Sequence, residues 1–327
     1  MIEELQTNIY CVKIPLPLSP LKNMNSYILK TDYRNLIIDT GLNHQECLDA
    51  MQHAIAALSI DMDRTDLFIT HFHIDHFGLV PRIISKNTRI YFNRIETELQ
   101  DNWEGFTVDM QYLTKHGFPE DMVSTVLNKH PAKDYFPVRW PKEAVLTQNG
   151  DRITVGPFQL ECIHTPGHSP GHMCLYEKKH KILFCGDHLL ADISPIITCW
   201  SENENRLGAY LNSLYKTKTI DVNIAYPGHH NVIHNHKDVI EKILTHHANR
   251  LSEACNIIVD NPQTAFTVAS NMHWNFNEGK WDSFPDIQKL FATSEALAHL
   301  RHLELENKIQ SIIKDGKIYF FGSQQSI

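Results

Sequence analysis

The sequence lacks the features of a secreted, membrane-spanning or disulfide-stapled protein. Its N-terminus begins with acidic residues and has no basic segment followed by a long apolar run, which argues against a signal peptide. No stretch approaches the roughly 18 consecutive apolar residues of a membrane span. The seven cysteines are isolated, with no CxxC pair and an odd total. Because disulfide frameworks belong to small secreted chains, we expect reduced thiols in a cytoplasmic protein.

Acidic residues outnumber basic residues in this sequence. The 30 Lys and Arg against 38 Asp and Glu leave a formal net charge of −8, so a general affinity for nucleic acid is not expected, although a local basic groove is compatible with this total. At 327 residues, 42% apolar and 21% charged, the composition is that of a globular chain with room for one large domain and a small appendage. The 21 histidines are unusual, and a set of them at ligand spacing would indicate a metal site.

Hydrophobic patterns outline an α/β protein whose polar motifs follow buried strands. Strands are predicted at 7–15, 25–31, 36–39 and 66–70, with several more between 152 and 187. Helices are predicted at 44–58 and 237–259. A histidine-rich motif begins where the strand 66–70 ends, so its side chains would stand on a rigid scaffold and face a crevice.

That motif, His71-Phe72-His73-Ile74-Asp75-His76, carries the main chemical signal. On an extended or turning segment alternate side chains point the same way, so His71 and His73 can bind one ion. Asp75 and His76 then point toward a neighbouring position. Imidazole and carboxylate ligands together suit zinc, iron or manganese. The sequence therefore predicts a metal site at the end of this strand.

Three further segments place a candidate ligand in a turn or directly after a strand. TPGHSPGH holds His168 in a Gly/Pro turn, CGDH places Asp187 after the strand KILFC, and YPGHH ends a strand with His229. A carboxylate at position 187 can bridge two cations. Three neighbouring histidines are interpreted as structural, with a direct or supporting role as the alternative: His172, His188 and His230.

HFHIDH, TPGHSPGH, CGDH and YPGHH, in this order, resemble the metallo-β-lactamase superfamily, and NSYIL followed by LIIDTG resembles its opening strands. The resemblance covers about residues 7–260 and implies an αββα sandwich with a two-metal site at one edge of the stacked sheets. It implies that His71, His73 and His168 hold the first metal, that Asp75, His76 and His229 hold the second, and that Asp187 bridges them. Asp39, in LIIDTG, matches a position that is usually structural.

The ligand set predicts a dinuclear metal-dependent hydrolase. Two divalent ions lower the pKa of a shared water, giving a metal-bound hydroxide near neutral pH, and polarise the group under attack. Zinc is the first choice, with iron or manganese as alternatives. Asp75 is the catalytic candidate, because it can orient the hydroxide or take its proton. The expected substrate is a small ester, thioester or lactone. Phosphodiesterase or ribonuclease activity is one alternative, and a non-catalytic regulator with an inherited fold is another.

Residues about 95–145 are predicted to form a helical insertion in a hydrolase domain that spans 1–260. Seven large aromatic residues in the insertion would suit an apolar wall over the metal site: Trp103, Phe106, Tyr112, Phe118, Tyr135, Phe136 and Trp140. This hypothesis favours an apolar acyl group in the substrate.

Residues 261–327 are predicted to form a small winged-helix-like domain. Three short helices, TAFTVASNM, SFPDIQKLF and SEALAHLRHLELENK, precede a hairpin that turns at Asp315–Gly316, with Thr264 and Ser294 as cap candidates. A metallo-β-lactamase domain followed by such a module resembles a subgroup that includes a mitochondrial ribonuclease and many bacterial hydrolases. The would-be recognition helix has no basic stripe, so packing, a site wall or a homodimer contact is expected rather than nucleic-acid binding.

Overall fold

The computed structural model describes residues 1–327 apart from 18, 20, 103–105, 130–143, 276–279 and 323–327. The chain forms two compact units. The first comprises residues 1–102, 134–195 and 213–240, and the second comprises 103–133, 196–212 and 241–327. Among the described residues, none of the helices combines the length and the apolar character needed to cross a bilayer.

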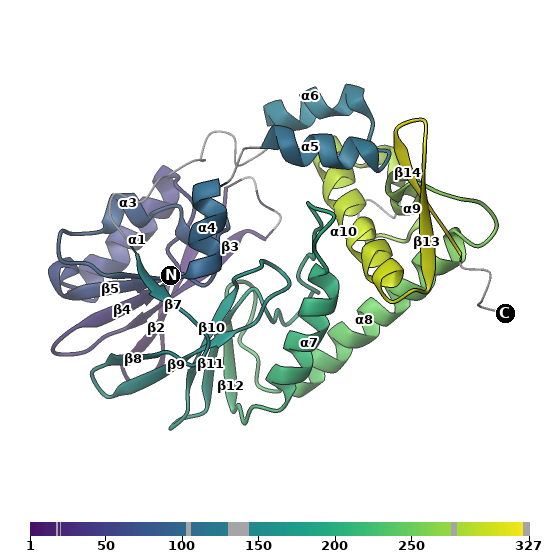
Figure 1. Ribbon diagram of the computed structural model, residues 1–327. Helices are drawn as coiled ribbons and strands as arrows, with labels where there is room; N and C mark the ends of the chain where they lie inside the picture. The colour runs from purple at the N-terminus through teal and green to yellow at the C-terminus, as the bar shows by residue number, and fades with distance from the viewer. Residues whose placement is uncertain (18, 20, 103–105, 130–143, 276–279, 323–327) are drawn as a thin grey trace. The chain divides into compact units, whose positions relative to one another are not determined.

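A mixed sheet of seven strands, in the order β1 to β7, forms one layer of the first unit (Figure 1). Neighbours are antiparallel from β1 to β4 and parallel from β4 to β7. The strands are β1 (Ile2–Gln6), β2 (Ile9–Pro15), β3 (Asn23–Leu29), β4 (Asn35–Ile38), β5 (Thr65–Phe68), β6 (Ile90–Asn93) and β7 (Val145–Thr147). Every residue of β4 and β5 is buried, as expected for central parallel strands covered on both faces.

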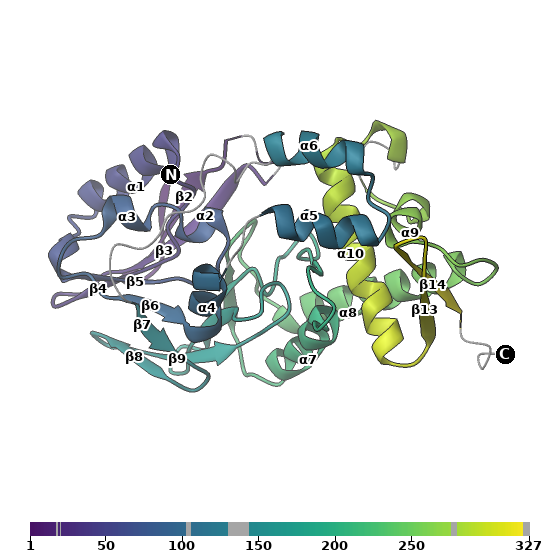
Figure 2. The same ribbon diagram turned by 45° about the horizontal axis from the view of Figure 1, so that its top comes forward.

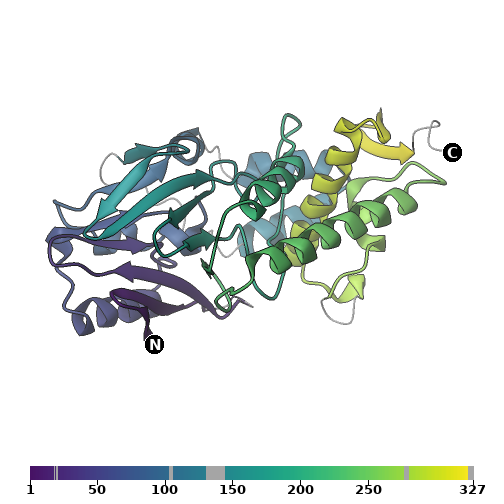
Figure 3. The same cartoon turned by 90° about the horizontal axis from the view of Figure 1, so that it is seen from below.

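A second sheet of five strands has the order β12-β11-β10-β9-β8. Its neighbours are antiparallel except for the parallel pair β11 and β12. The strands are β8 (Arg152–Val155), β9 (Phe158–His164), β10 (Met173–Glu177), β11 (Ile182–Gly186) and β12 (Ile224–Pro227). In Figure 3 the two sheets lie as stacked layers, purple and teal.

Apolar side chains fill the space between the sheets and cover the outer face of the first. Tyr27 and Phe68 from the first sheet meet Phe184 and Tyr226 from the second. On the outer face, α1 (Gln45–Ala57) and α3 (Val80–Ile83) bury an apolar side against the strands. The other helices of this unit are η1 (Met62–Arg64), α2 (Ile74–Phe77) and α4 (Arg94–Asn102).

The C-terminal end of α7 (Arg206–Lys218) and the N-terminal end of α8 (His236–Ile257) also belong to the first unit. From α7, the Ser213 hydroxyl donates to the Pro166 carbonyl at 2.8 Å, and Thr217 Oγ1 lies 2.8 Å from His188 Nε2. The αββα sandwich predicted from the sequence is therefore confirmed.

The second unit is mainly helical and includes most of α8. Its other elements are α5 (Phe106–Lys115), α6 (Glu120–Lys129), α9 (Ala265–Asn271), η3 (Trp281–Ser283), α10 (Asp286–Leu305) and the hairpin β13 (Ile309–Lys314) with β14 (Lys317–Gly322). The insertion helices α5 and α6 lie beside α10 and the hairpin (Figure 2). The domain boundary at 260/261 stays a prediction; the compact units divide the chain elsewhere, because the described insertion helices and α8 pack with the C-terminal segment.

Two features of the tail are confirmed and two are wrong. The segments SFPDIQKLF and SEALAHLRHLELENK, predicted as separate helices, form one continuous helix, α10. Thr264 caps α9 by accepting from the Thr267 N–H, and the hairpin turns at Asp315–Gly316. Ser294 caps no helix, because α10 runs unbroken through it. Its hydroxyl instead donates to the Cys199 carbonyl and accepts from the Cys199 N–H, both at 3.0 Å, so a tertiary partner replaces the capping role. The winged-helix assignment stays a prediction.

Candidate metal centre

The seven candidate ligands meet at one edge of the sandwich. The HFHIDH segment follows β5, Asp187 follows β11, and His229 follows β12. These are strands with parallel neighbours, and the carboxyl ends of such strands are where open α/β sheets place their sites. His168 comes from the turn between β9 and β10. Local strand order therefore brings segments far apart in the sequence to one place.

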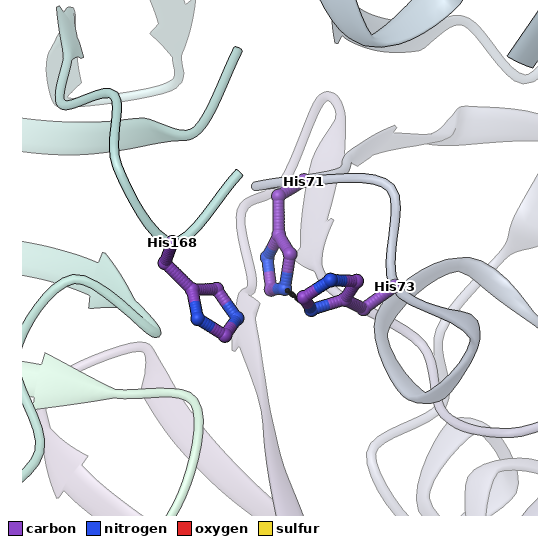
Figure 4. Close-up of side chains that lie close together, drawn as sticks. All are labelled: His71, His73 and His168. Atoms are coloured by element: carbon purple, nitrogen blue, oxygen red, sulfur yellow. Dashed lines mark hydrogen bonds between the residues drawn. The ribbon is translucent and has the colours of Figure 1, made fainter. Parts of the chain in front are cut away.

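His71, His73 and His168 form the first group (Figure 4). Nε2 of His71 lies 2.9 Å from Nδ1 of His73, and the His168 ring centroid lies 4.9 Å from that of His71 and 4.5 Å from that of His73. One nitrogen from each ring falls within 4.8 Å of the others. Three imidazole nitrogens at this spacing can bind one divalent ion.

Asp75, His76 and His229 form the second group. Oδ2 of Asp75 lies 3.3 Å from Nε2 of His229 and 4.0 Å from Nε2 of His76. Asp75 and His76 are neighbours in the short helix α2. Two imidazoles and a carboxylate can bind a second divalent ion.

Asp187 lies between the two groups. Its Oδ2 is 3.5 Å from Nε2 of His168, in the first group, and also 3.5 Å from Nε2 of both His76 and His229, in the second. It forms a third potential metal group with His71 and His76. A carboxylate at this position can contact both ions.

The buried polar atoms of this site fit metal ions better than they fit one another. Nε2 of His76 and Oδ1 of Asp187 are buried and make no hydrogen bond to any described residue, whereas most buried polar atoms in proteins do. Gly228 leaves the space open: a Cβ there would come within 2.5 Å of Asp187 Oδ1 and 2.8 Å of His76 Cε1. The donor set and its unsatisfied atoms are those of a divalent-cation site.

Electrostatics divide the histidines into two classes. Burial, together with neighbouring imidazoles, holds the pKa of His71 well below its usual value and lowers the pKa of His73 to about 3. For His76 and His229 burial also acts downward, but the Asp187 and Asp75 carboxylates outweigh it and raise the pKa. Neutral His71 and His73 are ready as ligands, while an ion at the second group would displace protons from His76 and His229.

The same field keeps the two carboxyl groups ionised. Burial would raise the pKa of Asp187 and of Asp75, but the surrounding imidazoles lower both below the usual range. The side chain of Asp75 is 23% exposed and that of Asp187 is 9% exposed. Of the two carboxylates, Asp75 is therefore the one accessible to a substrate.

Residues behind the ligands orient them. Asp39 Oδ2 lies 2.8 Å from Nδ1 of His76, which agrees with the structural role predicted for this aspartate. His172 Nε2 accepts from the Asp187 N–H at 3.1 Å, and its Nδ1 lies 2.8 Å from Thr165 Oγ1. His172 thus supports a candidate ligand. Such partners fix ring orientation and tautomer.

His188 and His230 also lie outside the three groups. Nε2 of His188 contacts Thr217 Oγ1, and Nδ1 of His230 lies 3.7 Å from an Asp192 carboxylate oxygen. Glu96, which the sequence patterns did not single out, proves to contact two of the ligand loops. Its position in a helix of ordinary composition carries no local signal, so only the fold reveals it.

Comparison with known proteins agrees with this geometry. Residues 21–229 match the model of the family described as the metallo-beta-lactamase superfamily. The probable metallo-hydrolase YqjP of Bacillus subtilis is 27% identical over 96% of this chain and 97% of its own length. An atrochrysone carboxyl ACP thioesterase of Emericella nidulans is 25% identical over 65% of this chain, and the match spans 53% of that relative's length.

Solved structures show the same fold along nearly the whole chain. A metallo-beta-lactamase family protein of Thermus thermophilus superposes with a TM-score of 0.82 at 25% identity, covering 98% of this chain and 100% of its own. A beta-lactamase domain protein of Burkholderia ambifaria superposes with a TM-score of 0.86 at 23% identity, covering 98% and 94%. The family match together with the site identifies a metal-dependent hydrolase. This chain belongs to the metallo-beta-lactamase superfamily.

Proposed function

We propose that this chain is a dinuclear hydrolase of small esters, thioesters or lactones, with zinc as the first candidate for both ions. The observation that carries the proposal is the position of Asp187, whose Oδ2 lies 3.5 Å from one imidazole of the first group and from two of the second. Paired ions that share a carboxylate suit hydrolysis, because both can act on one bond.

In this proposal His71, His73 and His168 would hold the first ion, Asp75, His76 and His229 would hold the second, and Asp187, which lies near both groups, would contact both ions. Bound ions of this kind supply Lewis acidity and lower the pKa of water. The protein supplies the imidazoles of His71 and His73, whose pKa values are lowered, and the ionised carboxylates of Asp75 and Asp187. Burial strengthens the electrostatic interactions at this edge, because screening by water is reduced.

Asp75 is the proposed catalytic residue. It is the more exposed of the two carboxylates, and its lowered pKa keeps it ionised at neutral pH. An ionised carboxylate at the open side can orient an attacking water and accept its proton at the oxygen that does not face the second metal group. The other oxygen, Oδ2, lies 3.3 Å from Nε2 of His229.

The substrate class rests on a relative and on charge. A matched relative is named for thioester cleavage on a carrier protein, and the net charge of −8 disfavours a polyanionic substrate. The aromatic side chains predicted to form a wall over the site are described only in part. Tyr112 and Phe118 are buried in the second unit, beside His116 and Phe266 respectively. The side chains of Trp103, Phe106, Tyr135, Phe136 and Trp140 lie outside the described part of the chain, so the substrate wall stays a prediction.

A substrate panel tests the proposal. Metal-loaded protein would be assayed on acyl-thioesters of increasing chain length, a lactone, a phosphodiester and a β-lactam, with the Asp75→Asn variant as control. We expect turnover of a thioester or lactone that the variant loses. Cleavage of the phosphodiester alone, inhibited by salt, would move the assignment to a nuclease or phosphodiesterase.

A further inference from the structure

The carboxylate of Glu96 ties together the two loops that carry the first metal group. Glu96 lies in the first turn of α4 and is fully buried. Its Oε2 accepts from the Phe72 N–H at 2.7 Å. Its Oε1 accepts from the Ser169 hydroxyl at 2.7 Å and from the Gly171 N–H at 2.5 Å. One side chain thus receives donors from segments about 100 residues apart in the sequence.

Those donors lie next to the candidate ligands. Phe72 separates His71 from His73, and Ser169 directly follows His168. Fixing the Phe72 amide sets the direction of the backbone from which both neighbouring imidazoles project. Fixing Ser169 and Gly171 closes the turn that presents His168. The three imidazoles of the first group therefore share one anchor.

The anchor is itself held by the sheet. Asn93, the last residue of β6, caps α4 by accepting from the Ile95 N–H at 2.7 Å. β6 pairs in parallel with β5, the strand that leads into HFHIDH. Gly171 makes the close approach possible, since a Cβ there would come within 2.7 Å of Glu96 Cγ. The position of Glu96 is thus determined by the same strands that place His71 and His73.

We propose that Glu96 is a positioning residue for the first metal ion. Acceptance by a carboxylate makes each hydrogen bond charge-assisted, which favours a single loop geometry. Outer partners of metal ligands typically contribute about 10-fold to 100-fold in metal affinity. This inference rests on the proposed function, because it concerns an ion that the first group would bind.

Two substitutions of Glu96 distinguish the effect of its charge from the effect of its side-chain length. In Glu96→Gln the amide keeps the shape, but its NH₂ must face either the Phe72 N–H or the Gly171 N–H, so one donor loses its acceptor. Glu96→Asp keeps the charge but is shorter by one methylene and cannot contact both loops. Ser169→Ala removes one hydrogen bond and leaves the carboxylate. Glu177→Gln is the matched control: Glu177 is also buried and accepts from the His180 N–H at 2.7 Å, at the far end of β10.

The measurement is Zn²⁺ binding to metal-stripped protein by competition with a chelating dye, alongside urea unfolding of the same samples. We expect wild type and Glu177→Gln to bind two ions alike, whatever stability the control loses. Glu96→Gln and Glu96→Asp should each lower the Zn²⁺ affinity of one site by about 10-fold to 100-fold. The affinity of the other site should stay within about threefold of the wild-type value. Ser169→Ala should lower the Zn²⁺ affinity of the same site by a smaller factor.

The outcomes distinguish this inference from the proposed function. A wild-type protein that binds no Zn²⁺ at micromolar concentrations would remove the dinuclear assignment itself. If the folded Glu96 variants bind two Zn²⁺ ions with the same affinities as wild type, only the positioning role is overturned. If the Glu96 variants do not fold, Ser169→Ala decides: unchanged affinity for both ions overturns the proposal.

Discussion

Asp39 and His76 form a buried pair in which Oδ2 of the carboxylate lies 2.8 Å from Nδ1 of the imidazole. The aspartate has a positive φ of 57° directly after β4, and it also accepts from the Thr70 N–H at 2.8 Å. This arrangement turns Nε2 of His76 toward Asp187. A residue that touches no substrate can therefore set the geometry of the second metal group.

Asp39→Asn should weaken the binding of a metal ion at the second group. Asparagine tolerates the left-handed backbone, so the variant should fold. It removes a charge-assisted contact, and we expect about 10-fold to 100-fold weaker binding of one Zn²⁺ ion. The free energy of unfolding should fall by about 1–3 kcal/mol. Dye competition and urea unfolding measure the two effects, and unchanged affinity for both ions would contradict the orienting role.

The native protein should contain about two transition-metal ions per chain. Elemental analysis of protein purified without added metal measures the content. Chelation should abolish hydrolysis and lower the melting temperature, because the ions bind the folded state only. Near-zero metal together with chelator-resistant activity would refute the metal-centre assignment.

Asp75→Asn should affect turnover far more than folding. The amide is a poor ligand and a poor proton acceptor, so we expect the turnover number to fall at least about 100-fold, the lower end for loss of a general base. The stability cost should be about 1 kcal/mol, since the side chain is partly exposed. Turnover within about threefold of wild type would show that another group handles the proton.

Glu295→Gln should stabilise the protein more at pH 8 than at pH 5. Burial raises the pKa of Glu295 to about 7, despite the opposing charge of Arg250. A carboxyl whose pKa is raised on folding binds more protons in the native state, so it lowers stability as pH rises from about 4.5 to about 7. Replacing the carboxyl group should raise the free energy of unfolding by roughly 1–3 kcal/mol at pH 8.

Urea unfolding at the two pH values provides the measurement for Glu295. Glu306→Gln, at an exposed position beyond the end of the same helix, is the control. An equal effect of Glu295→Gln at both pH values would mean that the carboxyl is ionised without cost in the folded protein.

Local sequence determined the ligand loops and several turns. The turn before His168 contains Gly167, whose positive φ of 144° few other residues adopt. Gly228, before His229, instead leaves room for the Asp187 carboxylate. The hairpin at Asp315–Gly316 could be predicted from its sequence, because Asp-Gly favours a tight two-residue turn. Both residues have a positive φ, 50° and 75°, as such a turn requires. The strand before HFHIDH was readable from its apolar run, since a strand buried on both faces needs no alternation.

Tertiary structure alone decided the features that depend on distant partners. β1 was not predicted, because a short strand paired on one side carries only a weak apolar pattern. Ser294 has the sequence of a helix cap, yet α10 continues through it because the Cys199 backbone, 95 positions away, satisfies its hydroxyl. Glu96 has no motif at all. Its function follows from donors 24, 73 and 75 positions away, and contacts at that separation exist only once the strands and loops have been brought together.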